Sequence, residues 1–299
     1  MVVPIGGGMR RTGSISLGVV ISLLVALSWA PASPRTGGAL PDLDIDAILE
    51  MAGVEAPELG TGLFIHIDWP VEAPFELDGA ELSSLTVNID ELGVAETHRA
   101  LEASEATGKD ASKECSDRAF VRTGPRWPAD DFPIVWRFKK SSGPAGIDRS
   151  DLIDHLEAAH EAWELPRSSC SKKPNIKFSY RYAGKTAKGI EYDGTNTIDF
   201  GSLGGGAIGM NYIWYKDGKF LETDLRLNKA DYKWTLRKKA KRKYHVINVV
   251  THELGHQVGL EDLGDPHGRL TMFGRSRRGE RSKVSLGRGD LRGVDALSP

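Results

Sequence analysis

The residues best suited to chemistry lie between Thr251 and Asp262, in the sequence T-H-E-L-G-H-Q-V-G-L-E-D. His252 and His256 are four positions apart, so on a helix both imidazoles leave the same face, one turn apart. That separation suits two ligands of one metal ion. Glu253 can reach water at such an ion without being a ligand itself. The spacing therefore predicts a metal site with Glu253 as general base.

A third ligand is expected after the helix. Gly259 stands where a left-handed residue ends a helix and turns the chain sharply. This turn would bring Asp262 back to the metal, and two histidines with one aspartate leave a fourth position open, as in catalytic zinc sites. His267 is the alternative third ligand if a longer loop presents it. The simplest competing interpretation is a helix with two surface histidines and a chance glycine.

Several elements are expected to position this motif. Apolar spacing predicts a helix over 242–258 that carries the histidines, a helix over 148–165 and a short helix over 288–297. Strands are predicted over 133–139, 176–182, 197–200, 208–215 and 221–227. Upstream, residues 63–69 and 82–89 resemble strands and the Glu/Ala-rich residues 96–107 a helix, but this region offers little material for a core of its own.

The motif resembles that of the metzincin clan of zinc peptidases, H-E-x-x-H-x-x-G-x-x-H or -D followed by a methionine-containing turn. A methionine follows here, Met272 in L-T-M-F-G. Within the clan the chain is most similar to bacterial secreted matrixin-like proteases, which share the G-L-x-D-L stretch, the T-M-[YF]-G turn and a closing short helix. The similarity extends from about Cys115 to the end of the chain.

This resemblance implies an α+β, zincin-like fold: a twisted five-stranded mixed sheet, a backing helix, and a zinc-binding helix below the cleft. It also implies that Met272 packs beneath the ligands, and that residues 206–212 form an edge strand that pairs with extended substrate. Animal matrixins use histidine as third ligand, but the clan's spacing favours Asp262 over His267 here.

The cysteines argue against one matrixin feature. The inhibitory sequence P-R-C-G-x-P-D is absent, and Cys115 has none of its neighbours. Cys115 and Cys170 are the two cysteines of the chain, and an even count in an exported protein predicts one disulfide. The alternative is that one thiolate serves as a metal ligand.

The N-terminus resembles an export signal. Basic residues at 10 and 11 precede a 16-residue apolar run over 15–30, which is shorter than the roughly 20 residues of a membrane-spanning helix. We expect residues 1–32 to be a cleaved signal peptide, so that the protein is secreted with no stable membrane association. An uncleaved anchor is the alternative.

Charge divides the remaining chain. Residues 41–117 carry a net charge of −16, whereas residues 118–299 carry +11. Opposite charges of this size favour association of the two parts. We therefore hypothesise that residues 33–114 are an acidic propeptide lying against a catalytic domain at 115–299. The alternative is a solubilising acidic extension.

The overall composition, with 27% charged and 40% hydrophobic residues, excludes a wholly disordered chain and a multi-span membrane protein. The basic run 233–243 lacks a recognisable nucleic-acid-binding fold, so no nucleic-acid partner is expected. The resemblance implies a monomeric secreted endopeptidase with one catalytic Zn²⁺ and polypeptide substrates; the sequence does not indicate Ca²⁺. Alternatives are a secreted binding protein on the same scaffold and a metal-dependent hydrolase of a non-peptide amide.

Overall fold

Most of the chain after residue 44 is described by the computed structural model: residues 45–58, 60–77, 80–90, 93–101, 112–166, 168, 170, 176–239 and 241–299. The chain divides into units 1–38 and 39–299, and all described residues belong to the second. The predicted signal peptide therefore lies outside the described residues. Within them, no helix has the length and apolar character needed to cross a membrane.

The helices are α1 (Ile45–Ala52), α2 (Ser112–Ser116), α3 (Arg149–Glu164), α4 (Val246–Val258) and α5 (Arg288–Leu297), with short 3-10 turns η1 (Ala129–Asp131), η2 (Gly204–Gly206) and η3 (Ser282–Val284). The strands are β1 (Gly62–Asp68), β2 (Phe75–Leu77), β3 (Ala80–Asp90), β4 (Gly93–Leu101), β5 (Ile134–Lys139), β6 (Tyr180–Thr186), β7 (Asn196–Gly201), β8 (Gly209–Lys216), β9 (Lys219–Asn228), β10 (Trp234–Thr235) and β11 (Tyr244–His245).

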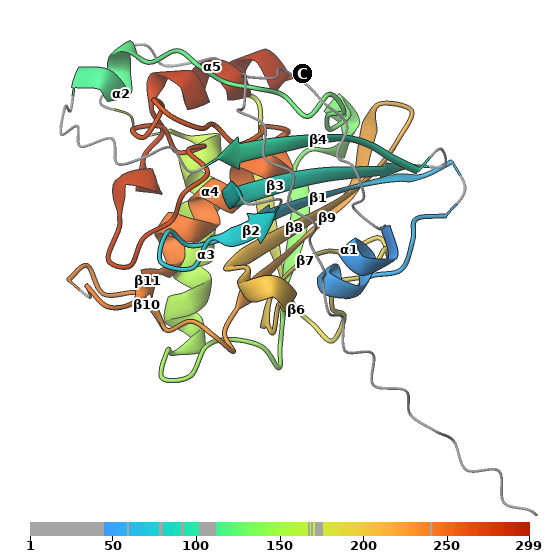
Figure 1. Cartoon of the computed structure of the whole chain (residues 1–299), viewed down its shortest axis with the longest axis horizontal. Helices are drawn as coiled ribbons and strands as arrows, with labels where there is room; N and C mark the ends of the chain where they lie inside the picture. The colour runs from blue at the N-terminus through green and yellow to red at the C-terminus, as the bar shows by residue number, and fades with distance from the viewer. Residues whose placement is uncertain are drawn as a thin grey trace, which may run out of the picture. The chain divides into compact units, whose positions relative to one another are not determined.

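The described strands β1 to β9 form one mixed sheet in the order β2-β3-β1-β8-β9-β7-β5-β6, with β4 paired to β3 (Figure 1). The C-terminal part supplies β8-β9-β7-β5-β6, in which β8 is antiparallel to β9 and the other neighbours are parallel. This is the predicted five-stranded mixed sheet, and the α+β, zincin-like fold is confirmed. The upstream strands, which were not expected in this sheet, extend it beyond β8. The expectation of an edge strand over 206–212 was therefore wrong, because β8 pairs with β1 as well as with β9.

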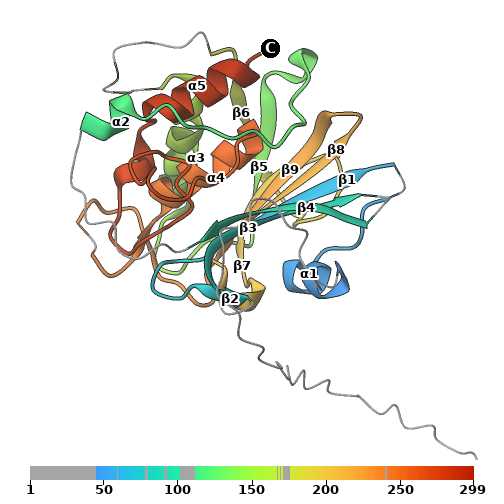
Figure 2. The same cartoon turned by 45° about the horizontal axis from the view of Figure 1, so that its top comes forward.

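Helices cover both faces of the sheet: α3 and α4 lie on one side and α1 on the other (Figure 2). The predicted apolar stripe of α3 is buried, and its Trp163 donates from Nε1 to the carbonyl oxygen of Thr251 in α4 (2.8 Å). Asp148 caps α3 by accepting the backbone N–H of Ser150 (2.8 Å). The backing helix thus holds the helix that carries the histidines.

Strand β1 alternates between two hydrophobic clusters, as the period of a strand requires. Phe64 joins the cluster that contains α3 and α4, whereas Leu63, Ile65 and Ile67 join a second cluster with α1. Met210, Tyr212 and Trp214 of β8 also belong to the second cluster. The upstream segment therefore shares a core with β8, in line with its lack of material for a core of its own.

One upstream expectation was wrong. The stretch 96–107 was predicted to be helical, but its residues up to Leu101 lie in β4, paired antiparallel with β3. Residues 102–107 lie outside the described residues. Pairing with β3 gives this stretch hydrogen bonds between strands, and such tertiary pairing overrides a modest helix propensity. Strand β6 also begins later than predicted, at Tyr180.

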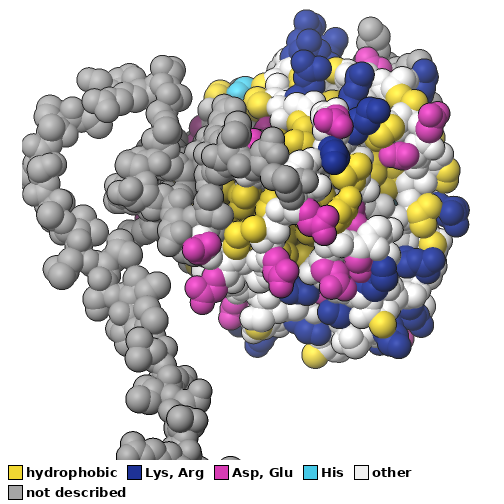
Figure 3. All heavy atoms as spheres, turned by 90° about the vertical axis from the view of Figure 1, so that its right-hand side faces the viewer, with side chains coloured by type: hydrophobic (Ala, Val, Ile, Leu, Met, Phe, Trp, Pro, Cys, Tyr) yellow, Lys and Arg dark blue, Asp and Glu magenta, His cyan; other side chains and the backbone are white. Residues whose placement is uncertain are grey.

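Charged side chains of both signs are mixed on the surface. In Figure 3, acidic side chains gather around exposed hydrophobic ones on one face, and lysines and arginines lie mostly toward its edges. Two kinds of contact that do not depend on charge join the upstream strands to the rest of the sheet. They are the pairing of β1 with β8 and the shared hydrophobic cluster.

A disulfide joins Cys115 and Cys170, whose Cα atoms are 5.1 Å apart. The cross-link closes a loop with a sequence separation of 55 residues and fastens the region of α2 to the chain that follows α3. The structure thus contains the predicted bond and leaves no cysteine available as a metal ligand.

Breaking this disulfide should lower the free energy of unfolding by about 2–4 kcal/mol, because the open chain gains conformational entropy when it unfolds. Urea unfolding of the Cys115→Ser/Cys170→Ser double variant against the wild type measures the loss. Adding reductant should destabilise the wild type and leave the double variant unchanged. Equal stability of the two proteins under oxidising conditions would contradict the prediction.

Candidate metal centre

His252 and His256 project from the same face of α4 and are fully buried. The Nδ1–H of His252 donates to the carbonyl oxygen of Thr271 (2.6 Å), and that of His256 donates to the carbonyl oxygen of Leu260 (2.8 Å). A carbonyl can only accept, so each neutral imidazole carries its lone pair on Nε2. Histidines that bind metals are oriented in this way.

The predicted turn after α4 is present. Gly259 adopts a left-handed conformation, with φ of 108°, and ends the helix. Beyond it, Oδ1 of Asp262 lies 3.2 Å from Nε2 of His252 and 3.7 Å from Nε2 of His256. His267 lies elsewhere, with its Nδ1 2.8 Å from Oδ2 of Asp117. The structure therefore brings Asp262, and not His267, to the two histidines.

A second carboxylate, which the sequence did not indicate, completes the cluster. Oδ2 of Asp68, the last residue of β1, lies 3.4 Å from Nε2 of His252 and 3.8 Å from Nε2 of His256. The potential ligand atoms of Asp68, His252, His256 and Asp262 all lie within 4.8 Å of one another. Tetrahedral zinc with bonds of about 2.1 Å places its ligands about 3.4 Å apart. The four side chains fit such an ion.

Electrostatics favour a positive charge in this cluster. Burial and Lys283 oppose a charge on His252, yet Asp68 and Asp262 outweigh them and raise its pKa to about 10. Burial alone would raise the pKa of Asp68, but its attraction to His252 and His256 holds that pKa well below the usual value. The carboxylates thus stabilise positive charge on the imidazole, and a metal cation held by these four side chains would gain the same attraction.

Glu253 lies beside the cluster and outside its set of ligand atoms. Its Oε2 accepts a hydrogen bond from Nδ2 of Asn211 in β8, and Oδ1 of Asn211 accepts from Nε2 of Gln257 (3.2 Å). Burial, followed by the nearby Asp68, raises the pKa of Glu253 well above its usual value. A carboxylate with a raised pKa, held in a fixed orientation, is suited to accept and return a proton.

The methionine turn packs under the helix between the two histidines. A Cβ built on Gly255 would lie 2.1 Å from Sδ of Met272 and 2.8 Å from Trp163, so only glycine fits at this position. Carboxylate oxygens of Asp290 in α5 accept the backbone N–H groups of Thr271 (2.8 Å) and Met272 (3.1 Å). Met272 is therefore a buried packing residue, and α5 fixes the carbonyl that orients His252.

Sequence reasoning missed Asp68, Asn211 and Asp290. Asp68 belongs to a strand far upstream of the motif, and only the pairing of β1 with β8 brings it to the histidines. Asn211 and Asp290 each lie within a predicted element, the strand over 208–215 and the helix over 288–297. Nothing in their spacing, however, indicates Glu253 or the methionine turn as the partner.

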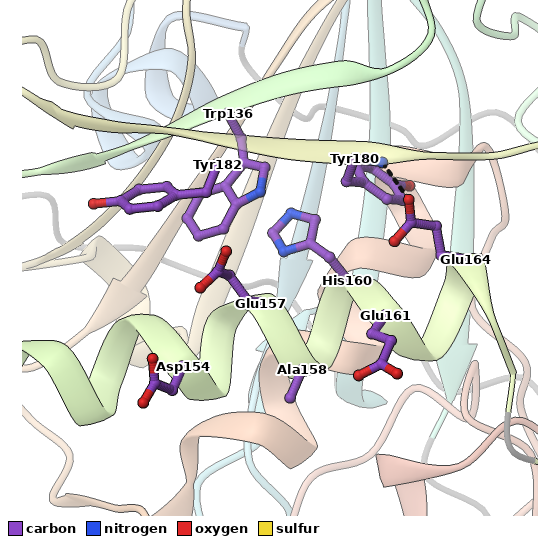
Figure 4. A pocket seen from close by; sticks show the side chains of 9 residues that line it. All are labelled: Trp136, Asp154, Glu157, Ala158, His160, Glu161, Glu164, Tyr180 and Tyr182. Atoms are coloured by element: carbon purple, nitrogen blue, oxygen red, sulfur yellow. Dashed lines mark hydrogen bonds between the residues drawn. The ribbon is translucent and has the colours of Figure 1, made fainter.

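A separate cavity of about 360 Å³ lies between α3 and β6, and Figure 4 shows His160 inside it between Trp136 and Tyr180. The imidazole stacks on Trp136 with ring centroids 4.4 Å apart, and its Nδ1–H donates to the carbonyl oxygen of Leu156 (2.8 Å). Burial lowers the pKa of His160 to about 4. His160 is thus a neutral, packed histidine.

Fold and cluster together define a metallohydrolase with a zincin-like domain, in which a glutamate stands beside a buried His-His-Asp group. Residues 126–298 match the family model described as matrixin, peptidase M10, and the chain belongs to this family of zinc metalloproteases. No curated protein matches the chain. The match begins downstream of β1 to β4, so the family assignment does not include Asp68.

Proposed function

We propose that the protein is a secreted zinc endopeptidase that hydrolyses polypeptides, with His252, His256 and Asp262 as ligands and Glu253 as general base. The observation that carries this proposal is the orientation of the histidines. Two backbone carbonyls hold both Nδ1–H groups, so both Nε2 atoms are directed at the carboxylate of Asp262.

A zinc ion bound there would supply Lewis acidity, which polarises a peptide carbonyl and acidifies water. The carboxylate of Glu253 takes the proton from the attacking water and returns it to the leaving amine. Asn211 donates to one oxygen of this carboxylate and leaves the other to meet the water. Asn211 lies in β8, which pairs with β1 on one side and with β9 on the other, so the residue that orients the base is held within the sheet.

Export is part of the proposal. The signal-like residues 1–32 and the Cys115–Cys170 disulfide both suit an extracellular protein. A monomer is expected because all the proposed ligands and the proposed base come from one chain, so that no partner subunit is needed to complete the site.

The test is hydrolysis of casein by the secreted protein, with its zinc content and chain length followed in parallel. We expect cleavage that 1,10-phenanthroline abolishes and added zinc restores, because the activity depends on a metal ion. Internal fragments identify an endopeptidase, whereas release of single terminal residues would contradict that assignment. A protein that binds no zinc, or one whose activity survives the chelator, would refute the proposed function.

A further inference from the structure

The basic run 233–243 meets a second basic segment in the structure. The loop between β10 and β11 carries six exposed lysines and arginines, at positions 237–239 and 241–243 (Figure 1). Arg277 and Arg278, which follow the methionine turn, are exposed as well. The backbone N–H of Gly279 donates to the carbonyl oxygen of Lys243 (2.9 Å) and joins the two segments. Together they form one surface of eight exposed basic side chains, here called the cationic surface.

The close approach of the two segments depends on a glycine. Gly279 has a φ of 76°, in the left-handed region, and a Cβ there would lie 2.9 Å from Cα of Lys241. A side chain at position 279 would therefore push the segments apart. The backbone thus holds like charges from two distant parts of the sequence next to one another.

The eight side chains of the cationic surface form no salt bridge with the described residues. The salt bridges that described lysines and arginines do form involve Lys139, Lys188, Arg226 and Arg275. The nearby Glu280 is engaged within its own segment, where it accepts the backbone N–H of Arg277 (3.0 Å) and the hydroxyl of Ser282 (2.5 Å). Clustered charges of one sign raise the local concentration of ligands of the opposite sign. The surface therefore favours a ligand with several negative charges.

We propose that the cationic surface binds acidic stretches of polypeptide substrates and thereby directs their cleavage. This inference rests on the proposed function, because it names the class of substrate that the same enzyme selects. Binding of an acidic peptide to the surface, however, requires no catalysis and can be measured separately.

The cationic surface begins close to the metal centre. A Cβ built on Gly274 would lie 3.0 Å from Cγ of Asp262, the proposed third ligand. Arg278 is four residues further along the chain, so its Cα lies within about 14 Å of the Cα of Gly274. An extended peptide spans this distance with about four residues. Acidic residues about four or more positions from the cleaved bond would therefore reach the surface.

An acidic residue of the chain itself already contacts one end of this surface. The backbone N–H of Val71 donates to the carbonyl oxygen of Ser276 (3.1 Å). In the next residue, Glu72, Oε1 accepts the backbone N–H of Arg278 (3.2 Å) and Oε2 accepts the hydroxyl of Tyr244 (2.7 Å). Main-chain hydrogen bonds and a carboxylate thus act together in this contact, as they would in an acidic peptide.

The chemistry of the cationic surface favours a polypeptide over other polyanions. The large hydrophobic residues that are exposed in the described part of the chain lie outside it, at positions 121, 165, 192 and 221, so it offers little to insert into a lipid bilayer. Trp234 and Tyr244 are buried, which leaves the bases of a single-stranded nucleic acid without these rings to stack on. A polysaccharide lacks the peptide groups that meet Ser276 in the contact described above.

The first arm of the test measures binding in the full-length Glu253→Gln variant, which the proposed mechanism makes inactive. Fluorescence anisotropy compares a labelled peptide that carries a run of glutamates with the same peptide carrying glutamines. We expect the glutamate peptide to bind at least about 10-fold more tightly at low ionic strength, and the difference to shrink as salt is added. Adding Lys238→Glu, Lys239→Glu and Lys241→Glu together should abolish the preference.

The matched control is the triple variant Lys177→Glu/Lys185→Glu/Lys219→Glu, in the same Glu253→Gln background. It changes the net charge of the protein by the same amount, at exposed positions in or next to β6 and β9. This control should keep the preference for the glutamate peptide. Equal binding of the two peptides, or an equal loss of preference in both triple variants, would overturn the proposal. Binding of heparin or duplex DNA through the same lysines, without a preference for the glutamate peptide, would also overturn it.

The second arm measures hydrolysis by the zinc-loaded protein with native Glu253. Fluorogenic peptides carry the glutamate or the glutamine run about four residues to one side or the other of the cleaved bond. We expect kcat/KM to be about 10-fold higher for the glutamate run on one of the two sides, mainly through a lower KM. The Lys238→Glu/Lys239→Glu/Lys241→Glu variant should lose this advantage and cleave the glutamine peptide like the wild type.

The two arms separate this inference from the proposed function. Equal kcat/KM for glutamate and glutamine peptides would overturn the role of the cationic surface in cleavage, while hydrolysis itself would leave the proposed function standing. If the zinc-loaded protein hydrolysed no peptide at all, the proposed function would be refuted, and with it the substrate role of the surface.

Discussion

Replacing Glu253 with glutamine should lower peptide hydrolysis by about 100- to 10,000-fold while the zinc content stays at the wild-type level. Glutamine retains the shape of the side chain but cannot accept the proton of water, and general base catalysis contributes a factor of this size. Glu253 stands outside the group of four potential ligand atoms, so its loss should not release the metal. Steady-state kinetics and elemental analysis on the same preparation measure both quantities.

The matched control is Glu157→Gln, the same substitution at an exposed position of α3, which should leave both quantities unchanged. If hydrolysis persisted in Glu253→Gln, the proton would be taken by another group. If zinc were lost with Glu253, the residue would be a ligand and the assignment of the base would be wrong.

The second large effect concerns the third ligand. Asp262→Asn should weaken zinc binding by more than about 100-fold, since even side chains that only support metal ligands contribute 10- to 100-fold. His267→Gln should bind zinc like the wild type, because Nδ1 of His267 lies against Asp117 and away from α4. Competition for zinc with a chromophoric chelator gives both affinities.

Circular dichroism of the two metal-free variants checks that each remains folded, so that a loss of zinc is not a loss of structure. Should His267→Gln lose zinc while Asp262→Asn keeps it, the loop must rearrange when metal binds, and the ligand set proposed here would be incorrect.

The parts of the site that the sequence predicts are those encoded locally. The step of four between His252 and His256 and the left-handed Gly259 fix three side chains within one helix and one turn, so spacing alone locates them. Strands β5, β7, β8 and β9 were likewise found near their expected positions, because each is a short apolar run between turn residues.

The part of the site that the sequence did not predict depends on pairing between strands that lie far apart in the chain. The approach of Asp68 to the histidines requires β1 to pair with β8 in one register, and a shift of one residue would turn Asp68 to the opposite face of the sheet. The charge difference between the two parts of the chain suggested that they associate, but it does not determine which residues of β1 stand opposite which residues of β8. The main-chain pairing and the apolar cluster around Ile65 and Tyr212 determine that register.

Gly255 lies on α4 between His252 and His256, and its lack of a side chain matters for the orientation of His252. A glycine inside a helix costs about 1 kcal/mol relative to alanine, so this position sacrifices helix stability. The missing side chain leaves the volume that Met272 and Trp163 fill, and Met272 adjoins the carbonyl of Thr271 that orients His252. The direction of Nε2 of His252, a proposed metal ligand, is therefore set in part by a residue that has no side chain, because Met272 and Trp163 occupy the space that a side chain would take.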